Sequence, residues 1–389
     1  MMNLSLRKQA LFLASVMIVV GLCFIVVIDL YIFRSEVIQT GKSVAYLGAE
    51  AQRELGFDLR ELRGETFKRP APYQPWNHTM RTVPMPFTSL HYYPSVRSAM
   101  VNTNDLGFRG TLNFAGQVAL ARSLHRDGGK VIVLTGGSGA FGAYSDTDDT
   151  DIEAYLNALL KEAGHHAVVF NMGMGSWTSN EELAAVVHWA RDLEPDLVIA
   201  YDGFNDMARP FPPIYRQNYK VHYGFNQIRA SYGLQYVSEY MDARVSDSEQ
   251  GIQGVLDNYR QNMTVMADIL WARGAKLILA TQMIQGYENN DHRQSELYYY
   301  PKVIDNYQRF VDTVREVSLR RESVRFVNAA ASLKGNPRAG EILGDFMHLG
   351  SPGHRYLAGL LFPHVVELLH QETQHHAPVA AISGATSGR

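Results

Sequence analysis

The chain has 389 residues, which is long enough to bury a full-sized core in one large domain or two small ones. Its formal net charge is −3 and no run of Lys and Arg stands out, so we expect no nucleic acid partner. The only cysteine is Cys23, which excludes an internal disulfide and a thiolate-ligated metal site.

The first predicted element is an apolar segment near the N-terminus. Residues 11–28 carry no charge, and residues 30–33 extend the segment past Asp29. About 20 apolar residues span the hydrocarbon core of a bilayer as a helix. A cleaved signal peptide is the alternative, but the run is long and no small-x-small cleavage site follows it. We therefore expect residues 1–33 to form a cytoplasmic N-terminus and a transmembrane anchor.

The charges that flank this segment predict its orientation. Arg7 and Lys8 precede it, whereas the residues after it carry both signs. The positive-inside bias then keeps the N-terminus in the cytoplasm and places the rest of the chain on the extracytoplasmic side, which in a bacterium is the periplasm. We expect a single-pass membrane protein.

The remaining chain divides by composition into an extension, a folded domain and a tail. Residues 34–129 are predicted to form a juxtamembrane stalk and N-terminal extension, helical to about residue 68 and then rich in proline. Residues 130–372 alternate strand and helix patterns and form the predicted domain. Residues 373–389 are small and polar, which is typical of a disordered tail.

The strand candidates of the domain are short, rich in Val, Ile and Leu, and too apolar to be half exposed. Their alternation with helix candidates indicates parallel strands covered by helices on both faces. We expect an α/β fold, a flavodoxin-like three-layer sandwich with a five-stranded parallel sheet. The predicted strands are 130–135, 167–171, 196–201, 276–282 and 324–328, and the predicted helices are 151–163, 179–192, 252–273, 301–319 and 352–370.

Three other segments stand out from this pattern. The acidic run at residues 145–153 lacks the spacing of a calcium loop and is predicted to cap the helix that follows. The long connections 207–250 and 283–300 are rich in aromatic residues, which disfavours disorder. They are interpreted either as lids that bury their own core or as surfaces that stack on sugars.

The first strand leads into a glycine-rich turn, GGSGAFG, at residues 136–142. Its Gly-x-Gly-x-x-Gly spacing also occurs in dinucleotide-binding turns, which need an acidic residue after the second strand. Asn171 and Met172 occupy that place, and no Lys-Ser/Thr pair follows the glycines as in a phosphate-binding loop. The turn is therefore interpreted as one that presents a nucleophile, Ser138.

An activated serine needs a base, a group that orients the base, and donors for the developing oxyanion. In an open α/β sheet these groups come from loops at the carboxyl ends of the strands. The second strand is followed by Gly173 and Gly175, and the third by Asn205. Asp345 and His348 follow the fifth strand, and their i, i+3 spacing can place a carboxylate against an imidazole.

The blocks GGSGAFG, NMGMG, GFND and DFMH occur in this order at the predicted strand ends, and the set resembles the four blocks of the SGNH/GDSL hydrolase family. The resemblance implies that Ser138 is the nucleophile and that its N–H is one oxyanion donor. Gly175 would supply the second donor and the Asn205 side chain the third. His348 would be the base and Asp345 its orienting group.

Two further features bear on this resemblance, which covers about residues 130–370. Gly137 stands where the family's block has an aspartate, and Gly173 is the alternative to Gly175 as a donor. The upstream segment VNTNDLGFRG, which contains Arg109, resembles a segment of membrane-anchored members associated with polysaccharide modification.

The resemblance and the expected location imply a membrane-anchored serine esterase. It would act through an acyl-serine intermediate on O-acyl groups, above all O-acetyl groups, of an extracytoplasmic carbohydrate. Two alternatives stay open: a polysaccharide O-acetyltransferase with the same catalytic residues, and a catalytically silent module that binds polymer or assembles a complex. The implied partners are an ester substrate and the membrane, no metal or organic cofactor is implied, and the oligomeric state is left open.

Overall fold

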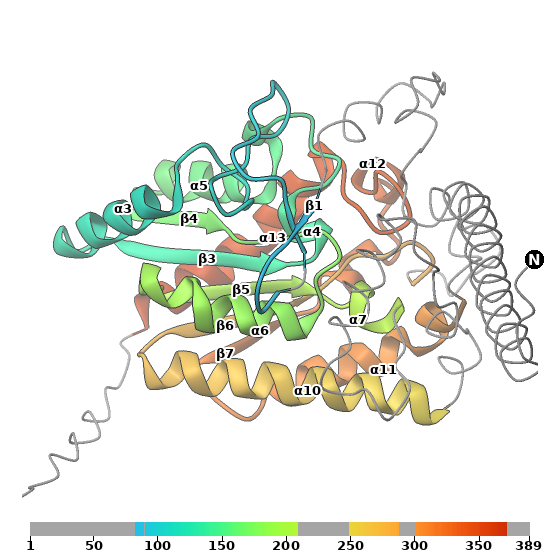
Figure 1. Ribbon diagram of the computed structural model, residues 1–389. Helices are drawn as coiled ribbons and strands as arrows, with labels where there is room; N and C mark the ends of the chain where they lie inside the picture. The colour runs from blue at the N-terminus through green and yellow to red at the C-terminus, as the bar shows by residue number, and fades with distance from the viewer. Residues whose placement is uncertain (1–81, 89, 209–248, 288–300, 372–389) are drawn as a thin grey trace, which may run out of the picture. The chain divides into compact units, whose positions relative to one another are not determined.

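The computed structural model describes residues 82–88, 90–208, 249–287 and 301–371 (Figure 1). The predicted anchor, the stalk helix, the tail and most of the two aromatic connections lie outside these ranges. Within them, no helix is both long enough and apolar enough to cross a bilayer.

A five-stranded parallel sheet forms the centre of the described domain, as predicted (Figure 1). Its strand order is β4-β3-β5-β6-β7, so the chain adds its second strand on one side of β3 and its third on the other. This is the flavodoxin-like order, whose topological switch point lies at the carboxyl ends of β3 and β5. The strands are β3 (Lys130–Gly136), β4 (Ala167–Asn171), β5 (Leu197–Asp202), β6 (Lys276–Thr281) and β7 (Val324–Val327).

Helices cover both faces of the sheet, because alternate residues of each strand point to opposite sides. Val131 and Val133 belong to one apolar cluster, and Ile132 and Leu134 belong to the other. The first cluster includes residues of α3 (Phe114–Arg126), α6 (Ser179–His188), α10 (Glu249–Ala272) and α11 (Pro301–Ser318). The second includes residues of α5 (Ile152–Glu162) and α13 (Ser351–His370).

Residues before β3 also take part in this packing. A short antiparallel hairpin, β1 (Thr82–Pro84) and β2 (Leu90–Tyr92), precedes α3. Tyr92 and Phe108 are buried in the same cluster as β3. Helix α3 was not predicted, because it buries only Gln117, Ala121 and Leu124 and so carries a weak apolar pattern.

Short helical elements occupy several strand ends and connections. The predicted helix 179–192 ends at His188 and continues as a 3-10 helix, because Trp189 has a φ of −125°, outside the helical range. The other short elements are α4 (Ser138–Phe141), α7 (Phe204–Ala208), α12 (Ala339–Ile342) and 3-10 helices at Asp148–Thr150, Ala190–Leu193 and Ala330–Leu333.

The acidic run before α5 caps helices, as predicted. The Asp151 carboxylate accepts the Ala154 N–H at 2.8 Å and so caps α5. Thr147 and Thr150 form a capping box around the 3-10 helix. Asp148, which also belongs to the acidic run, pairs with the buried Arg109.

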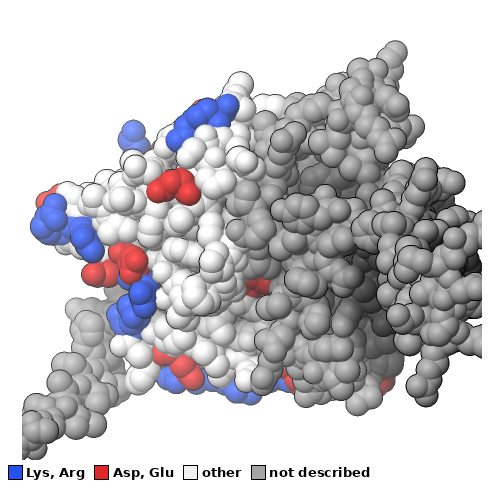
Figure 2. Space-filling model, in the orientation of Figure 1, with Lys and Arg blue, Asp and Glu red and all other residues white. Residues whose placement is uncertain are grey.

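Charged side chains of both signs lie close together on the face of the molecule seen in Figure 2. Ion pairs that involve partly exposed side chains include Lys130 with Asp196 and Arg325 with Glu367. Exposed pairs of this kind contribute little to stability, so the apolar clusters on the two faces of the sheet are the main stabilising feature.

Candidate active site

The turn after β3 presents Ser138 as the first residue of the four-residue helix α4. Gly142 ends this helix with a φ of 84°, a left-handed conformation that glycine adopts without strain. Ser138 therefore lies at the carboxyl end of β3, at the switch point of the sheet. Its hydroxyl is half-buried and its N–H donates to no described residue.

A chain of hydrogen bonds connects Ser138 with His348 and Asp345. The distance from Ser138 Oγ to His348 Nε2 is 2.7 Å, and the distance from His348 Nδ1 to Asp345 Oδ2 is also 2.7 Å. His348 and Asp345 lie on a loop closed by an antiparallel bridge between Leu343 and Leu349. The fold thus brings the predicted pair, Asp345 and His348, to the predicted nucleophile, although Ser138 and His348 are 210 residues apart in the sequence.

The environment of Asp345 keeps its carboxyl group ionised. Burial by itself would raise the pKa of Asp345, but the His348 ring and the N–H groups of Met347 and His348 outweigh it and hold the pKa below its usual value. An ionised carboxylate is an acceptor only, so His348 Nδ1 carries the proton that it donates to Asp345. Nε2 is then the acceptor for the Ser138 hydroxyl proton, which is the tautomer that a general base needs.

The two glycines after β4 differ in the state of their N–H groups. The Gly173 N–H donates to the Asn171 side chain at 2.9 Å. Among the described residues, no hydrogen bond involves the Gly175 N–H. Gly175 can therefore donate to a substrate oxygen, whereas Gly173 is already engaged.

Asn205 brings a side-chain amide to the same end of the sheet. It lies on α7 directly after β5 and is 8% exposed. Its Nδ2 donates one hydrogen to the Trp177 carbonyl at 2.8 Å, which leaves a second hydrogen for another acceptor. The next residue, Asp206, accepts hydrogen bonds from the N–H and the hydroxyl of Ser179. Asp206 thus connects α7 to the start of α6.

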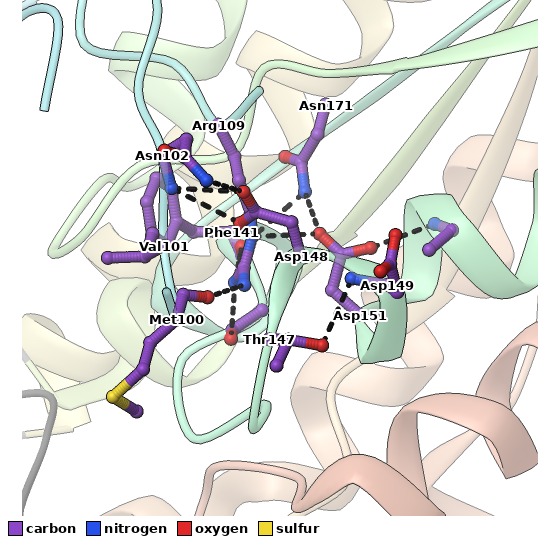
Figure 3. Close-up of polar contacts among 12 residues, drawn as sticks. Met100, Val101, Asn102, Arg109, Phe141, Thr147, Asp148, Asp149, Asp151 and Asn171 are labelled. Atoms are coloured by element: carbon purple, nitrogen blue, oxygen red, sulfur yellow. Dashed lines mark hydrogen bonds and ion pairs between the residues drawn. The ribbon is translucent and has the colours of Figure 1, made fainter. Parts of the chain in front are cut away.

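Arg109 is a buried cation beside the turn that carries Ser138 (Figure 3). Its Nη1 donates to the carbonyl oxygens of Phe141 and Gly142 at 3.1 and 2.8 Å. Its Nε donates to Asp148 at 2.8 Å and its Nη2 to the Met100 carbonyl at 3.2 Å. One guanidinium group therefore connects the segment before α3, the acidic run and the end of α4.

Asp151 is a second carboxylate at the same nitrogen of Arg109, with its Oδ2 3.1 Å from Nε. Burial raises the pKa of Asp151 to about 6, although the Arg109 charge and hydrogen bonds from Ala154 and Asn171 oppose the rise. The sequence pointed to Arg109 only through the resemblance of its segment, and nothing in the pattern indicated its contact with α4.

Two aromatic residues near the site were missed by the sequence interpretation. The Tyr144 ring stacks on the His348 ring, with 5.0 Å between centroids and an interplanar angle of 28°. The Tyr92 hydroxyl occupies the space that a Cβ atom on Gly175 would need, so only glycine fits at that position. Both contacts join residues far apart in the chain, so no sequence spacing could reveal them.

Comparison with known proteins places the chain in a family. The model of the GDSL-like lipase/acylhydrolase family matches residues 134–356. No curated protein matches the chain.

Solved structures with a similar fold include a lipase/acylhydrolase from Enterococcus faecalis, at 15% identity and a TM-score of 0.41 over 63% of this chain and 99% of that chain. A catalytic mutant of an acetylxylan esterase from Geobacillus stearothermophilus has 17% identity and a TM-score of 0.39 over 64% of this chain and 98% of that chain. A GDSL-like lipase from Bacteroides thetaiotaomicron has 15% identity and a TM-score of 0.39 over 66% of this chain and 99% of that chain.

The family model covers more than half of the chain, from β3 into α13, and includes the loops that carry the site. The chain belongs to the GDSL-like lipase/acylhydrolase family and is an ester-hydrolysing serine hydrolase.

Proposed function

We propose that Ser138 is the nucleophile of this hydrolase, with His348 as its general base and Asp345 as the group that orients the base. The observation that carries the proposal is the continuous relay from Ser138 Oγ through the imidazole to Asp345, with both hydrogen bonds at 2.7 Å. His348 takes the Ser138 proton as Oγ bonds to the acyl carbon, and returns a proton to the leaving alcohol as the ester bond breaks. Water then attacks the acyl-serine with the same base and releases the acid.

The oxyanion of each tetrahedral intermediate would be bound by three donors. They are the N–H groups of Ser138 and Gly175 and the second hydrogen of Asn205 Nδ2. Their available hydrogens at the switch point of the sheet support these roles. Donors aimed at a developing charge lower the barrier because they are already oriented before the reaction starts.

The substrate that we propose is an O-acyl group, in particular O-acetyl, on an extracytoplasmic carbohydrate. Support comes from the sequence: the apolar N-terminal segment with Arg7 and Lys8 before it, the aromatic connections, and the segment around Arg109 that resembles membrane-anchored members. The proposed enzyme is a single-pass membrane protein whose catalytic domain faces the periplasm.

A fluorophosphonate probe tests the nucleophile without requiring a substrate. The full-length protein in detergent should gain one probe mass by intact mass spectrometry, and Ser138→Ala should gain none. His348→Ala should react much more slowly, while Ser123→Ala on α3 serves as a matched serine control. A folded wild type that does not react would contradict the proposed nucleophile, and polymer binding retained in Ser138→Ala would then favour the silent binding module.

Acetate release tests the substrate class. Wild type and Ser138→Ala are compared on O-acetylated polysaccharides and on esters of longer acyl chains. Release of acetate from the polysaccharide by wild type alone supports the proposal, and turnover of only the long-chain esters contradicts it. Transfer of acetyl groups to added oligosaccharide in preference to water would identify the transferase instead.

A further inference from the structure

Tyr144 has an unusual backbone for its residue type. Its φ is 67°, in the left-handed region where a side chain other than that of glycine, asparagine or aspartate is strained. Strain of this kind persists only where surrounding contacts enforce it, and it concentrates at functional sites. Tyr144 comes three residues after Phe141, the last residue of α4, on the segment that follows the turn of Ser138.

Contacts on both sides hold this segment in place. The Ala143 N–H donates to the Ser138 carbonyl at 3.0 Å, and the Ala143 carbonyl lies 3.2 Å from His354 Nε2. The Asp146 N–H donates to Ser351 Oγ at 2.9 Å. The strained residue is therefore fixed between the helix that carries the nucleophile and the first turn of α13, which follows the base in sequence.

The fixed backbone places the Tyr144 ring against the imidazole of His348. The two rings are stacked, with centroids 5.0 Å apart and planes inclined by 28°. The hydrogen bonds to Asp345 and Ser138 act at the edge of the imidazole. The Tyr144 ring adds a contact on the imidazole face and so opposes movement of the ring out of its plane.

We propose that Tyr144 is a positioning residue that holds the imidazole plane of His348 and stabilises its cation during attack, an inference that rests on the proposed role of His348 as base. When His348 takes the Ser138 proton it becomes positive, and the electron-rich face of an aromatic ring attracts a cation. This attraction arises only as the proton moves, so it lowers the barrier without tightening ground-state binding. The backbone strain at Tyr144 is the cost of placing a ring there.

The chain offers a matched control at Phe87. Its φ is 71°, and its ring stacks on His188 with centroids 4.0 Å apart and an interplanar angle of 17°. His188 is the last residue of α6, whereas Ser179 at the start of that helix donates to Asp206, the neighbour of Asn205. Phe87 thus has the same strain and the same type of stack, but at the opposite end of α6.

The test compares Tyr144→Gly, Tyr144→Phe and Phe87→Gly in the full-length protein. Measurements are the second-order rate of fluorophosphonate labelling, kcat and KM on p-nitrophenyl acetate, and the melting temperature. Glycine removes both the ring and the strain, so Tyr144→Gly should label and turn over about three to ten times more slowly, the size of one aromatic pair. KM should stay unchanged and the melting temperature should not fall.

The two other variants separate positioning from general packing. Tyr144→Phe keeps the ring and should react at the wild-type rate, and Phe87→Gly should also do so. Wild-type kinetics in Tyr144→Gly, or a slow Tyr144→Phe, would overturn the positioning role while leaving Ser138 labelling intact. Failure of the wild type itself to label would instead contradict the proposed function.

Discussion

The amide nitrogen of Asn205 lies 2.5 Å from the position that a Cβ atom on Gly137 would occupy. A real Cβ atom does not come this close to another heavy atom, so any side chain at residue 137 has to displace the Asn205 amide. This contact gives a physical reason for glycine at a position where the family's first block has aspartate. It also makes residue 137 a sensitive probe of the proposed oxyanion donor.

We expect Gly137→Asp to lose activity while it keeps the fold. The displaced group is the end of one side chain, so the domain can adjust, but the loss of one oxyanion donor costs about 10²- to 10³-fold in kcat. Gly137→Ala should show a smaller loss, and Gly340→Ala, which meets no atom within 4 Å, should show none. The measurements are kcat and the melting temperature, and wild-type kcat in Gly137→Asp would contradict the assigned role of Asn205.

Asp345→Asn tests the tautomer of His348, the proposed base. The asparagine oxygen can still accept the N–H groups of Met347 and His348, which Asp345 accepts at 2.8 and 2.7 Å, so the loop should stay folded. Its amide group cannot accept the Nδ1 proton of His348 in the same way, and the proton moves to Nε2. We expect kcat to fall by about 10³- to 10⁴-fold, as for a base held in the wrong tautomer. A loss below tenfold at an unchanged melting temperature would show that Asp345 does not orient His348.

Arg109→Lys should destabilise the protein. Lysine carries the charge but lacks the planar fork, so it cannot pair with Asp148 and with the Phe141 and Gly142 carbonyls together. Buried carbonyls without partners should lower the free energy of unfolding by about 3 kcal/mol in urea titrations. Arg97→Lys is the control, because Arg97 is exposed and water can replace its bonds. If both variants lost the same free energy of unfolding, the burial of Arg109 would not be the reason for its contribution to stability.

Glu182→Gln should change how stability depends on pH. Burial, together with the neighbouring Asp202 and Asp206 carboxyls, raises the pKa of Glu182 well above 4.5. The unfolded chain titrates this carboxyl near 4.5, whereas the folded protein keeps the proton to a higher pH. Between the pKa of the unfolded chain and that of the folded protein, the stability therefore falls as pH rises. Glutamine has no such proton and keeps the size of the side chain.

Relative to wild type, the free energy of unfolding of Glu182→Gln should therefore rise by roughly 1 kcal/mol per pH unit inside this pH window. Below the window, the difference between the two proteins should change little with pH. Urea titrations near pH 4.5 and near pH 7 measure the difference. The exposed Glu162→Gln is the control and should show the same difference from wild type at both pH values. A pH-independent effect of Glu182→Gln would mean that Glu182 is ionised in the folded protein.

The fold was predictable because its signals are local. Each strand is a short apolar run whose alternate residues meet one of two helical layers, and this pattern depends only on near neighbours. The cap formed by Asp151 and the pairing of Asp345 with His348 are also i, i+3 relations, which sequence spacing can suggest. The order of strand and helix patterns then implied that the glycine-rich turn and the other blocks would end at one edge of the sheet.

The contacts that shape the site were not predictable in this way. One such contact is the stack of Tyr144 on His348, and another is the approach of the Asn205 amide to Gly137. Each contact brings together segments that are distant in the chain, and their approach depends on strand order and on the path of the connecting segments. The same is true of the difference between the Gly173 and Gly175 N–H groups, since both glycines fit the pattern and only one is engaged.

Periodicity and capping are properties of adjacent residues, so the amino-acid sequence was sufficient for the sheet, its helical layers and the chemical groups at its edge. The orientation of those groups depends on packing between segments as far apart as Ser138 and His348, which are 210 residues apart. There, a shift of one side chain decides which hydrogen atom is available. Folding brings these segments together, and the geometry of the site follows from that packing.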